Sequence, residues 1–322
     1  ALFFGGSAFD LVEVLGARRL RREFAPAPPA SDRLWPFVSI HIPIHNEPPE
    51  MVRTTLDSLA RLDYPNFEVI VIDNNTKDET LWRPVERHCG ELNARTSGRF
   101  RFFHVDPLAG FKAGALDYEL ERADPRATIV GVVDSDYVVE PTWLKATVPH
   151  FDDAKVGFVQ CPQDHRDIET NRFKRMIGWE YAGFFAIGMV QRNERDAIIQ
   201  HGTMVLLRRS AMQAGGGWAT WCIVEDAEMG LRLVRDGYKS VYIRDSYGRG
   251  LMPDGLGGYK IQRFRWAYGA VQIMRRYARD FLLPGPLTFG QRYHYLFGWT
   301  PWIADAASVV LGWLAVAWTA LD

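Results

Sequence analysis

The segment TIVGVVDSD, residues 128–136, carries the clearest fold signal in this 322-residue chain. Most residues in its first part are β-branched, and the run has the length of a buried strand. It shows no alternation of polar and apolar residues, which is typical of a strand covered on both faces, as in a parallel sheet. We therefore expect a buried strand that ends where Asp134 and Asp136 begin.

Similar runs occur towards the N-terminus, separated by segments whose apolar residues have helical spacing. The expected strands and helices are Phe37–Ile42, Phe67–Ile72, Phe100–Val105 and Thr128–Val133, and Pro49–Leu62, 76–94 and Gly110–Ala123. Strands that alternate with helices predict an α/β fold with a mostly parallel, doubly wound sheet. Ligands of such sheets bind beyond the carboxyl ends of the strands, where Glu47, Asp73, Asp134 and Asp136 fall.

The second half of the chain is less regular. We expect strands at Gly157–Gln160 and Thr203–Leu207, and helices at Asn171–Asn193, Glu225–Asp236 and Tyr259–Asp280. The segment Ser246–Gly258 is rich in glycine and predicts a mobile loop.

Composition narrows the classes of partner. A net charge of −1 provides no bulk basic field, so a nucleic-acid partner is not expected. Aromatic residues make up 13% of the chain, and tryptophan and tyrosine suit both carbohydrate faces and membrane interfaces. The three cysteines have no metal-binding or disulfide spacing, which favours a reducing, cytosolic setting.

Both ends of the chain have features of membrane segments. Residues 1–16 are largely apolar and precede arginines at 18, 19, 21 and 22 and a proline-rich linker, the pattern of a helix leaving a membrane on its cytoplasmic side. A surface amphipathic helix is the alternative. Tyr295–Leu321 is nearly all apolar and long enough to span about 30 Å of hydrocarbon, which predicts a transmembrane or partly re-entrant helix.

Two acidic motifs could carry catalytic chemistry. Asp134 and Asp136, two residues apart at a strand end, can share a hard cation such as Mg²⁺, which would neutralise a departing diphosphate, although such a pair also arises by chance. Glu225 and Asp226 open a helix, where a carboxylate can deprotonate an attacking hydroxyl group. The alternative is that these two side chains only favour the positive end of the helix.

Two basic motifs complete the pattern. In QRFRW, residues 262–266, Gln262, Arg265 and Trp266 share one helix face, where the guanidinium can bind phosphate and the indole can stack on a sugar. A solvated basic face with one core tryptophan is the alternative. Lys112 stands at an expected helix start, where it could meet a phosphate or ribose or be an ordinary surface lysine.

Taken in order, these segments resemble a family 2 glycosyltransferase with the GT-A fold, specifically the processive, membrane-embedded branch of cellulose, hyaluronan and chitin synthases. The resemblance covers about residues 36–275 of the chain. The motifs that carry it are IPIHNE at 42–47 with Asp73, FKAG at 111–114, DSD at 134–136, HGT at 201–203, VED at 224–226 and QRFRW at 262–266. Asn74 after Asp73, Val224 before the Glu-Asp pair, and His45 depart from the common pattern.

The resemblance implies a role for each site residue. Glu47, Asp73 and Lys112 are expected to hold the uracil and ribose. Asp134 and Asp136 are expected to serve the diphosphate and a Mg²⁺ or Mn²⁺ ion, with Asp136 the better metal ligand.

The remaining roles concern transfer and the acceptor. Asp226, beside Glu225, is the expected general base, and Trp266 and His201 are expected to contact the acceptor. Residues that bind the diphosphate or close the site are Gln262, Arg263 and Arg265. The segment 246–258 resembles a gating loop over the donor site, and residues 171–192 an interfacial helix.

The resemblance also implies an organisation for the chain. The expected parts are a membrane-proximal helix end and linker (1–30), a nucleotide-sugar-binding half (31–165), an acceptor-binding half with interfacial helices and the gating loop (166–285) and a C-terminal transmembrane segment (286–322). The expected location is the bacterial plasma membrane with the catalytic domain facing the cytoplasm. Further membrane helices or subunits are expected partners.

The expected activity is inverting, metal-dependent, processive extension of a β-linked polysaccharide. Cys161-Pro162-Gln163 and Tyr295–Ala304 resemble bacterial β-glucan synthases, which favours UDP-glucose as donor and a β-1,3 linkage. Two alternatives remain open: a non-processive transferase acting on a lipid or short acceptor, and a catalytically silent scaffold subunit.

Overall fold

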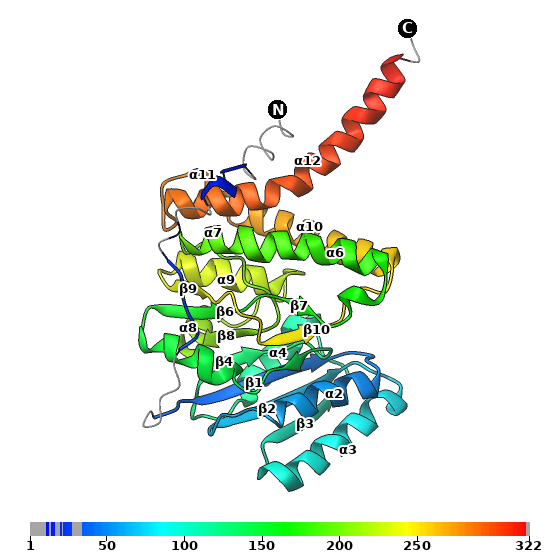
Figure 1. Ribbon diagram of the computed structural model, residues 1–322, viewed down its shortest axis with the longest axis vertical. Coiled ribbons are helices and arrows are strands. Elements are labelled where there is room, and N and C mark those ends of the chain that lie inside the picture. The colour runs from blue at the N-terminus through cyan, green and yellow to red at the C-terminus, as the bar shows by residue number, and fades with distance from the viewer. Residues whose placement is uncertain (1–10, 13, 17–19, 21, 28–33, 320–322) are drawn as a thin grey trace.

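The computed structural model describes residues 11–12, 14–16, 20, 22–27 and 34–319 of the chain, which are organised around one large sheet (Figure 1). In the described residues this sheet has seven strands in the order β3-β2-β1-β4-β8-β6-β9. Their bounds are β1 Phe37–Ile44, β2 Phe67–Asn74, β3 Phe100–Val105, β4 Ala127–Val132, β6 Val156–Gln160, β8 Val205–Arg208 and β9 Lys239–Tyr242.

The sheet is mostly parallel, which confirms the predicted α/β class. Strands β1 to β4 pair in parallel, as do β6 and β9, whereas β8 runs antiparallel to both β4 and β6. The four strands expected in the first half lie within two residues of their predicted ends. Since β6 pairs with β8 and β9, strands from both sides of the proposed division at residues 165/166 belong to a single sheet.

Helices cover both faces of the sheet. Their bounds are α2 Pro49–Leu59, α3 Glu79–Thr96, α4 Phe111–Arg122, α5 Trp143–Thr147, α6 Arg172–Gly183, α7 Met189–Asn193, α8 Arg209–Ala214, α9 Glu225–Arg235, α10 Leu256–Arg276, α11 Ala278–Leu282 and α12 Phe289–Thr319. Short 3₁₀ turns lie at η2 Val148–Asp152 and η3 Ile168–Thr170, and a π turn, η4 Phe184–Gly188, joins α6 to α7.

Strand β4 and the residue after it, Val133, show why a hydrophobic core forms on each face of the sheet. Val130 and Val132 pack into one hydrophobic core with α4, α9 and α10, while Ile129 and Val133 pack into a second core with α2 and α3. Successive side chains of a strand point to opposite faces, so a continuous apolar run serves both cores.

A second, small sheet was not expected from the sequence. It joins β5 Val138–Val139, β10 Gly248–Gly250 and β7 Asp164–His165. The prediction of a mobile loop over Ser246–Gly258 is therefore wrong for its first part. The peptide groups of Gly248–Gly250 pair with strands distant in sequence, and α10 begins at Leu256, inside the expected loop.

Helices α6, α7, α10 and α12 gather at the end of the molecule opposite α3, and the C-terminal part of α12 projects beyond the rest (Figure 1). The expected helical stretch Asn171–Asn193 is confirmed as α6, η4 and α7. Across the residues that the structure describes, no helix combines the length and hydropathy needed to cross a bilayer, so the transmembrane helix predicted over Tyr295–Leu321 is not confirmed.

Most of the membrane-proximal segment predicted at 1–30 lies outside the described residues. Of the four arginines in its basic cluster, only Arg22 is described. Its guanidinium pairs with Asp196 at 2.8 Å, and its backbone N–H donates to Glu194 at 2.7 Å. Arg22 therefore binds to the acidic loop that follows α7.

Candidate active site

A wide cleft of about 1120 Å³ opens beyond the carboxyl ends of β1 and β4. This is where a doubly wound sheet is expected to bind a ligand. The predicted site residues that line it come from both halves of the chain: Glu47, Lys112, Asp134, Asp136, Glu225, Asp226, Gln262, Arg265 and Trp266.

Lys112 is a shared counter-ion in this cleft. Its ammonium donates to Asp134 Oδ1 at 2.6 Å and to the carbonyl of Gly202 at 3.2 Å. Burial lowers the pKa of Lys112, but the charges of Asp134 and Glu225 outweigh burial and hold it above the usual range. Lys112 is thus a fixed positive charge among several carboxylates, not an ordinary surface lysine.

The surroundings of Asp136 disfavour its charged form. Burial, then the charge of Asp134, raises the pKa of Asp136 to about 6. Its Oδ2 accepts the N–H of Leu251 at 2.8 Å, and the N–H of Asp136 itself also bonds to the carboxylate.

Glu47 adds a third carboxylate beside this pair. Burial raises the pKa of Glu47, and the charges of Asp136 and Asp134 raise it further. Such concentrated negative charge, carried by oxygen atoms, suits a divalent Mg²⁺ or Mn²⁺ ion that also binds phosphate oxygens. Carboxylates such as Asp136 and Asp134 are ligands of the kind such a cation takes, but the described residues contain no group of three or more His, Cys, Asp or Glu side chains that could hold a metal ion by themselves.

Glu225 and Asp226 occupy the first turn of α9. Asp226 Oδ1 accepts the N–H of Ala227 at 2.8 Å, so the carboxylate lies at the positive end of the helix. Burial raises the pKa of both carboxyl groups, and Lys112 opposes that shift at both. A buried carboxylate with a raised pKa is a competent general base near neutral pH.

Helix α10 presents two faces to two different spaces. Gln262, Arg265 and Trp266 line the cleft together, as their spacing predicts. Arg263, one residue on and about 100° around the helix, does not line it. Its Nη2 pairs with Glu180 at 2.9 Å, and its guanidinium lies 4.2 Å from the ring centroid of Trp266. Its position does not support the predicted contact with diphosphate.

Asp73 is also displaced from its predicted position on the cleft wall. Its side chain is about 1% exposed, and it does not line the cleft. Thr76 donates to its Oδ1 at 2.6 Å and His104 Nδ1 lies 2.7 Å from its Oδ2. Both oxygens are thus engaged within the protein, because β2 buries all of its residues.

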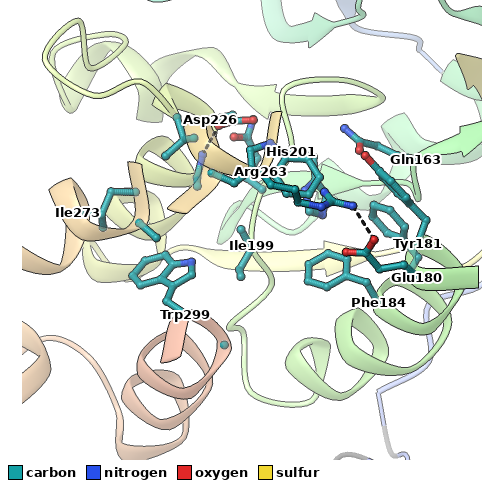
Figure 2. A pocket seen from close by; sticks show the side chains of 17 residues that line it. Gln163, Glu180, Tyr181, Phe184, Ile199, His201, Asp226, Arg263, Ile273 and Trp299 are labelled. Carbon is teal, nitrogen blue, oxygen red and sulfur yellow. Dashed lines mark hydrogen bonds and ion pairs between the residues drawn. The ribbon is translucent and has the colours of Figure 1, made fainter. Parts of the chain in front are cut away.

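A second, narrower cavity of about 210 Å³ adjoins the cleft. The two spaces share Gln163, Val224, Asp226 and Trp266. Figure 2 shows Trp299 and Ile273 on one side of this cavity, Tyr181 and Phe184 on the other, and Asp226 at one end. His201 lines it too, with its ring centroid 5.5 Å from that of Phe184.

Several lining residues were not singled out from the sequence. Phe111, about 87% exposed, and Trp221 add aromatic rings to the cleft. Gln200 and Trp299 add to the narrow cavity. Phe111 is the first residue of the FKAG motif and Gln200 adjoins His201, which are usable signals, whereas Trp299 reaches the site through the packing of α12 against the core.

Comparison with known proteins gives consistent results. The cellulose synthase catalytic subunit [UDP-forming] of Xanthomonas axonopodis pv. citri is 30% identical over 84% of this chain, and the chain spans 36% of its length. The probable glucomannan 4-beta-mannosyltransferase 7 of Oryza sativa subsp. japonica is 26% identical over 82% of this chain, which spans 45% of its length. The chain therefore corresponds to less than half of these relatives.

Solved structures share the fold. The mannosyltransferase PcManGT of Pyrobaculum calidifontis, in complex with GDP-Man and Mn²⁺, has a TM-score of 0.73 at 19% identity, covering 98% of this chain and 84% of that one. The 1–349 fragment of S. aureus TarS with UDP-GlcNAc has a TM-score of 0.58 at 16% identity, covering 82% and 71%. These likenesses support the GT-A fold.

The model of the family described as "Glycosyltransferase like family 2" matches residues 36–269, which contain the cleft carboxylates, the helix α9 and the QRFRW segment. The chain belongs to this family of glycosyltransferases.

Proposed function

We propose that the chain is the catalytic domain of an inverting, processive glycosyltransferase that extends a β-glucan from UDP-glucose. The observation that carries this proposal is the meeting of two different spaces at Asp226 and Trp266. One space is wide and charged, as a nucleotide sugar requires. The other is narrow and aromatic, as a carbohydrate chain requires.

The cleft would bind the donor through its charged groups. Arg265 and Gln262 reach it from α10 and would contact the diphosphate, since a guanidinium pairs with phosphate oxygens. Lys112 would stay close to the same oxygens. A Mg²⁺ or Mn²⁺ ion bound by Asp136 and Asp134 would supply charge neutralisation for the leaving diphosphate.

Asp226 would act on the acceptor. It would take the proton from the attacking hydroxyl as that oxygen bonds to the anomeric carbon and the bond from that carbon to the diphosphate breaks. Attack from the side opposite the leaving group inverts the configuration, so an α-linked donor yields a β-linked product. Glu225 and Lys112 would tune the basicity of Asp226 through their charges.

Processivity would follow from the narrow cavity. The rings of Trp266, Tyr181, Phe184 and Trp299 line it from α10, α6, η4 and α12. A chain held there after transfer would keep its new end near Asp226, because Asp226 and Trp266 line both spaces. A single transfer to a small acceptor would need no such cavity beyond the base.

We propose further that the domain works at the cytoplasmic face of a bacterial plasma membrane, with additional membrane helices or subunits. Apolar side chains are exposed on the helices at one end of the molecule. They include Met176, Trp179, Ile261, Phe264, Tyr268, Trp313 and Trp318. Exposed tryptophan and tyrosine among apolar residues suit a lipid interface.

Sugar transfer by the intact, membrane-reconstituted protein tests the proposal. Donors would be a panel of UDP- and GDP-sugars with Mg²⁺ or Mn²⁺, and products would be digested with linkage-specific glucanases. We expect polymer from UDP-glucose alone, cut by a β-1,3-glucanase and absent with Asp226→Asn. Polymer from another donor would keep the mechanism and reject the glucan; single-sugar products would favour a non-processive transferase.

A further inference from the structure

Gln272, on α10, binds a segment that is distant in sequence. Its Oε1 accepts the N–H of Ile223 at 3.1 Å, and its Nε2 donates to the carbonyl of Trp221 at 3.0 Å. One side-chain amide therefore binds a donor and an acceptor of the same stretch of backbone. This stretch, 221–224, is neither helix nor strand and leads directly into α9.

Two neighbours of Gln272 on α10 contact the same segment. A Cβ added to Gly269, three residues earlier, would lie 2.8 Å from Val224 Cγ1 and closer still to Cγ2, so Val224 packs on the bare backbone of the helix. Arg276, four residues later, has its guanidinium 5.5 Å from the ring centroid of Trp221. Spacings of three and four residues place these positions on one side of α10, which thus holds 221–224 at three points.

The same helix carries the groups expected to bind the donor. Gln262, Arg265 and Trp266 lie about two to three turns before Gln272, and all four residues line the cleft. One helix thus connects the expected diphosphate-binding groups to the segment that precedes Asp226.

The start of α9 has no side-chain cap to fix it. Val224 stands in the capping position and makes no capping hydrogen bond with its side chain, which has no polar atom. The two bonds to Gln272 instead hold the backbone two to four residues before Glu225. Asp226 follows in the first turn of the helix, so its place depends on where this segment is held.

We propose that Gln272 is a positioning residue for sugar transfer: by binding 221–224 to α10, it sets the place of Asp226 relative to the groups that would bind the diphosphate. The inference rests on the proposed function. The oxygen and the nitrogen of the Gln272 amide both bind backbone, so the residue acts through Asp226 and not by binding the donor.

A positioning role and a structural role have different consequences. Displacing a catalytic group by about 1 Å can lower the rate roughly 100-fold. Two hydrogen bonds at a half-exposed side chain contribute far less to stability, because water replaces them when they are lost. A change at Gln272 should therefore affect the rate of transfer much more than folding or donor affinity.

The test replaces Gln272 by methionine, which has a similar volume and removes both polar groups. We expect kcat for transfer to fall about 10- to 100-fold, while KM for the nucleotide sugar and the calorimetric Kd of UDP with Mg²⁺ stay within about threefold of wild type. The melting temperature should fall by no more than a few degrees. Gln272→Asn, whose amide is one methylene shorter and misses the two backbone groups, should behave in the same way and replaces the methionine variant if that one does not fold.

Val271→Met is the matched control. Val271 precedes Gln272 on α10, is about 39% exposed and lines neither the cleft nor the narrow cavity. We expect kcat of this variant to stay within twofold of wild type.

Amide hydrogen exchange in the ligand-free protein checks the contact without any turnover. The N–H of Ile223 should exchange at least tenfold faster in Gln272→Met than in wild type. The N–H of Ala227, which donates to Asp226 Oδ1, should also exchange faster, because a displaced Asp226 no longer holds it. Amides in the middle of α10 should be unchanged.

Three outcomes would overturn the inference. A kcat equal to wild type in Gln272→Met would show that the contact does not set the place of Asp226. A kcat and a donor affinity that fall together, with a melting temperature lower by about 10 °C or more, would show a structural role. Unchanged exchange at Ile223 and Ala227 would show that Gln272 does not hold the segment.

Failure of the wild-type protein to transfer from any donor would instead reject the proposed function. Faster exchange at both amides in Gln272→Met would then still support the positioning of Asp226 by Gln272.

Discussion

The cleft and the narrow cavity share residues of one wall, but the cleft is lined by charged groups and the cavity mainly by aromatic rings. In the cleft the charges of Asp134, Glu225 and Asp226 act on Lys112, and burial together with neighbouring carboxylates raises the pKa values of Glu47 and Asp136. The cavity has aromatic rings and the unpaired amide of Gln200. The difference supports the proposal that the charged donor binds on one side of Asp226 and the neutral acceptor on the other. Under that proposal the two substrates would be separated by chemistry as well as by position.

The largest loss of sugar transfer is expected from replacing Asp226, which lines both the cleft and the narrow cavity. Replacing Asp226 by Asn should lower transfer by roughly 10²–10⁴-fold, the usual range for a positioned base, while nucleotide binding persists. Radiolabelled sugar incorporation and UDP calorimetry would measure the two quantities. Asp236→Asn, an exposed carboxylate at the other end of α9, is the control. Turnover that survives in Asp226→Asn would refute the base assignment.

Trp266 lines both the cleft and the narrow cavity, so its replacement should affect polymer extension and donor hydrolysis to different extents. We expect Trp266→Ala to lower polymer extension by about 10-fold or more, with donor hydrolysis partly retained, because an aromatic platform is worth roughly 1–3 kcal/mol to a stacked ring. Product length on gels and UDP release would report the two activities. Tyr268→Ala, exposed on the same helix, serves as control. Equal loss of both activities would mean that Trp266 is structural.

The charge of Lys112 should set the pH range of the base. Burial raises the pKa of Asp226 and Lys112 lowers it, so activity should fall on acidification through a pKa above the ordinary aspartate value. Lys112→Met should move this acid limb of kcat/KM to higher pH by about one unit. Lys145→Met, which breaks a distant ion pair with Asp63, should leave the limb in place. An unshifted limb in Lys112→Met would show that the charge of Lys112 does not reach the base.

Burial of Asp136 and the neighbouring charge of Asp134 should also lower the free energy of unfolding at neutral pH. The folded pKa of Asp136, about 6, lies above its unfolded value, so its contribution is favourable at low pH and is lost as pH rises through 6. Asp136→Asn should therefore raise the free energy of unfolding by about 1 kcal/mol at pH 7.5, with no gain near pH 4. Urea denaturation at both pH values would measure this change.

Asp153→Asn provides the opposite sign as a control. Bonds from Lys155 N–H and Lys239 lower the pKa of Asp153, so its replacement should destabilise slightly at neutral pH. Equal changes in the free energy of unfolding of Asp136→Asn and Asp153→Asn would show that the surroundings of Asp136 are not the cause.

The smallest effect concerns the segment over the cleft. Leu251 N–H donates to Asp136 Oδ2, and Lys174 binds Asp254 at 2.8 Å, so part of 251–258 is tethered. We expect UDP with Mg²⁺ to slow amide hydrogen exchange in 251–258 by a few-fold, with little change in β10. Exchange that is unchanged throughout would exclude closure of this segment over the donor.

The sequence predicted the regular half of the fold well, because each β-branched run there supplies both faces of one strand. The small sheet could not be predicted, since Gly248–Gly250 has no apolar pattern and its pairing depends on β5 and β7. Spacing correctly grouped Gln262, Arg265 and Trp266 on the cleft, but it did not show that Arg263, three residues before Trp266, would pair with Glu180 and line the narrow cavity instead. Nothing in the sequence showed that Thr76 and His104 would occupy both oxygens of Asp73.

The glycine at 230 has a mechanical consequence. A Cβ built on Gly230 would lie 2.6 Å from Gln200 Cβ and 3.2 Å from its backbone nitrogen, so α9 packs closely on the segment at Gln200. Under the proposed function, the lack of a side chain at Gly230 would keep the first turn of α9, with Asp226, at a short and constant distance from the wall of the narrow cavity. Replacing Gly230 by alanine should push α9 away from the segment at Gln200. Sugar transfer should then fall although none of the proposed catalytic groups is changed.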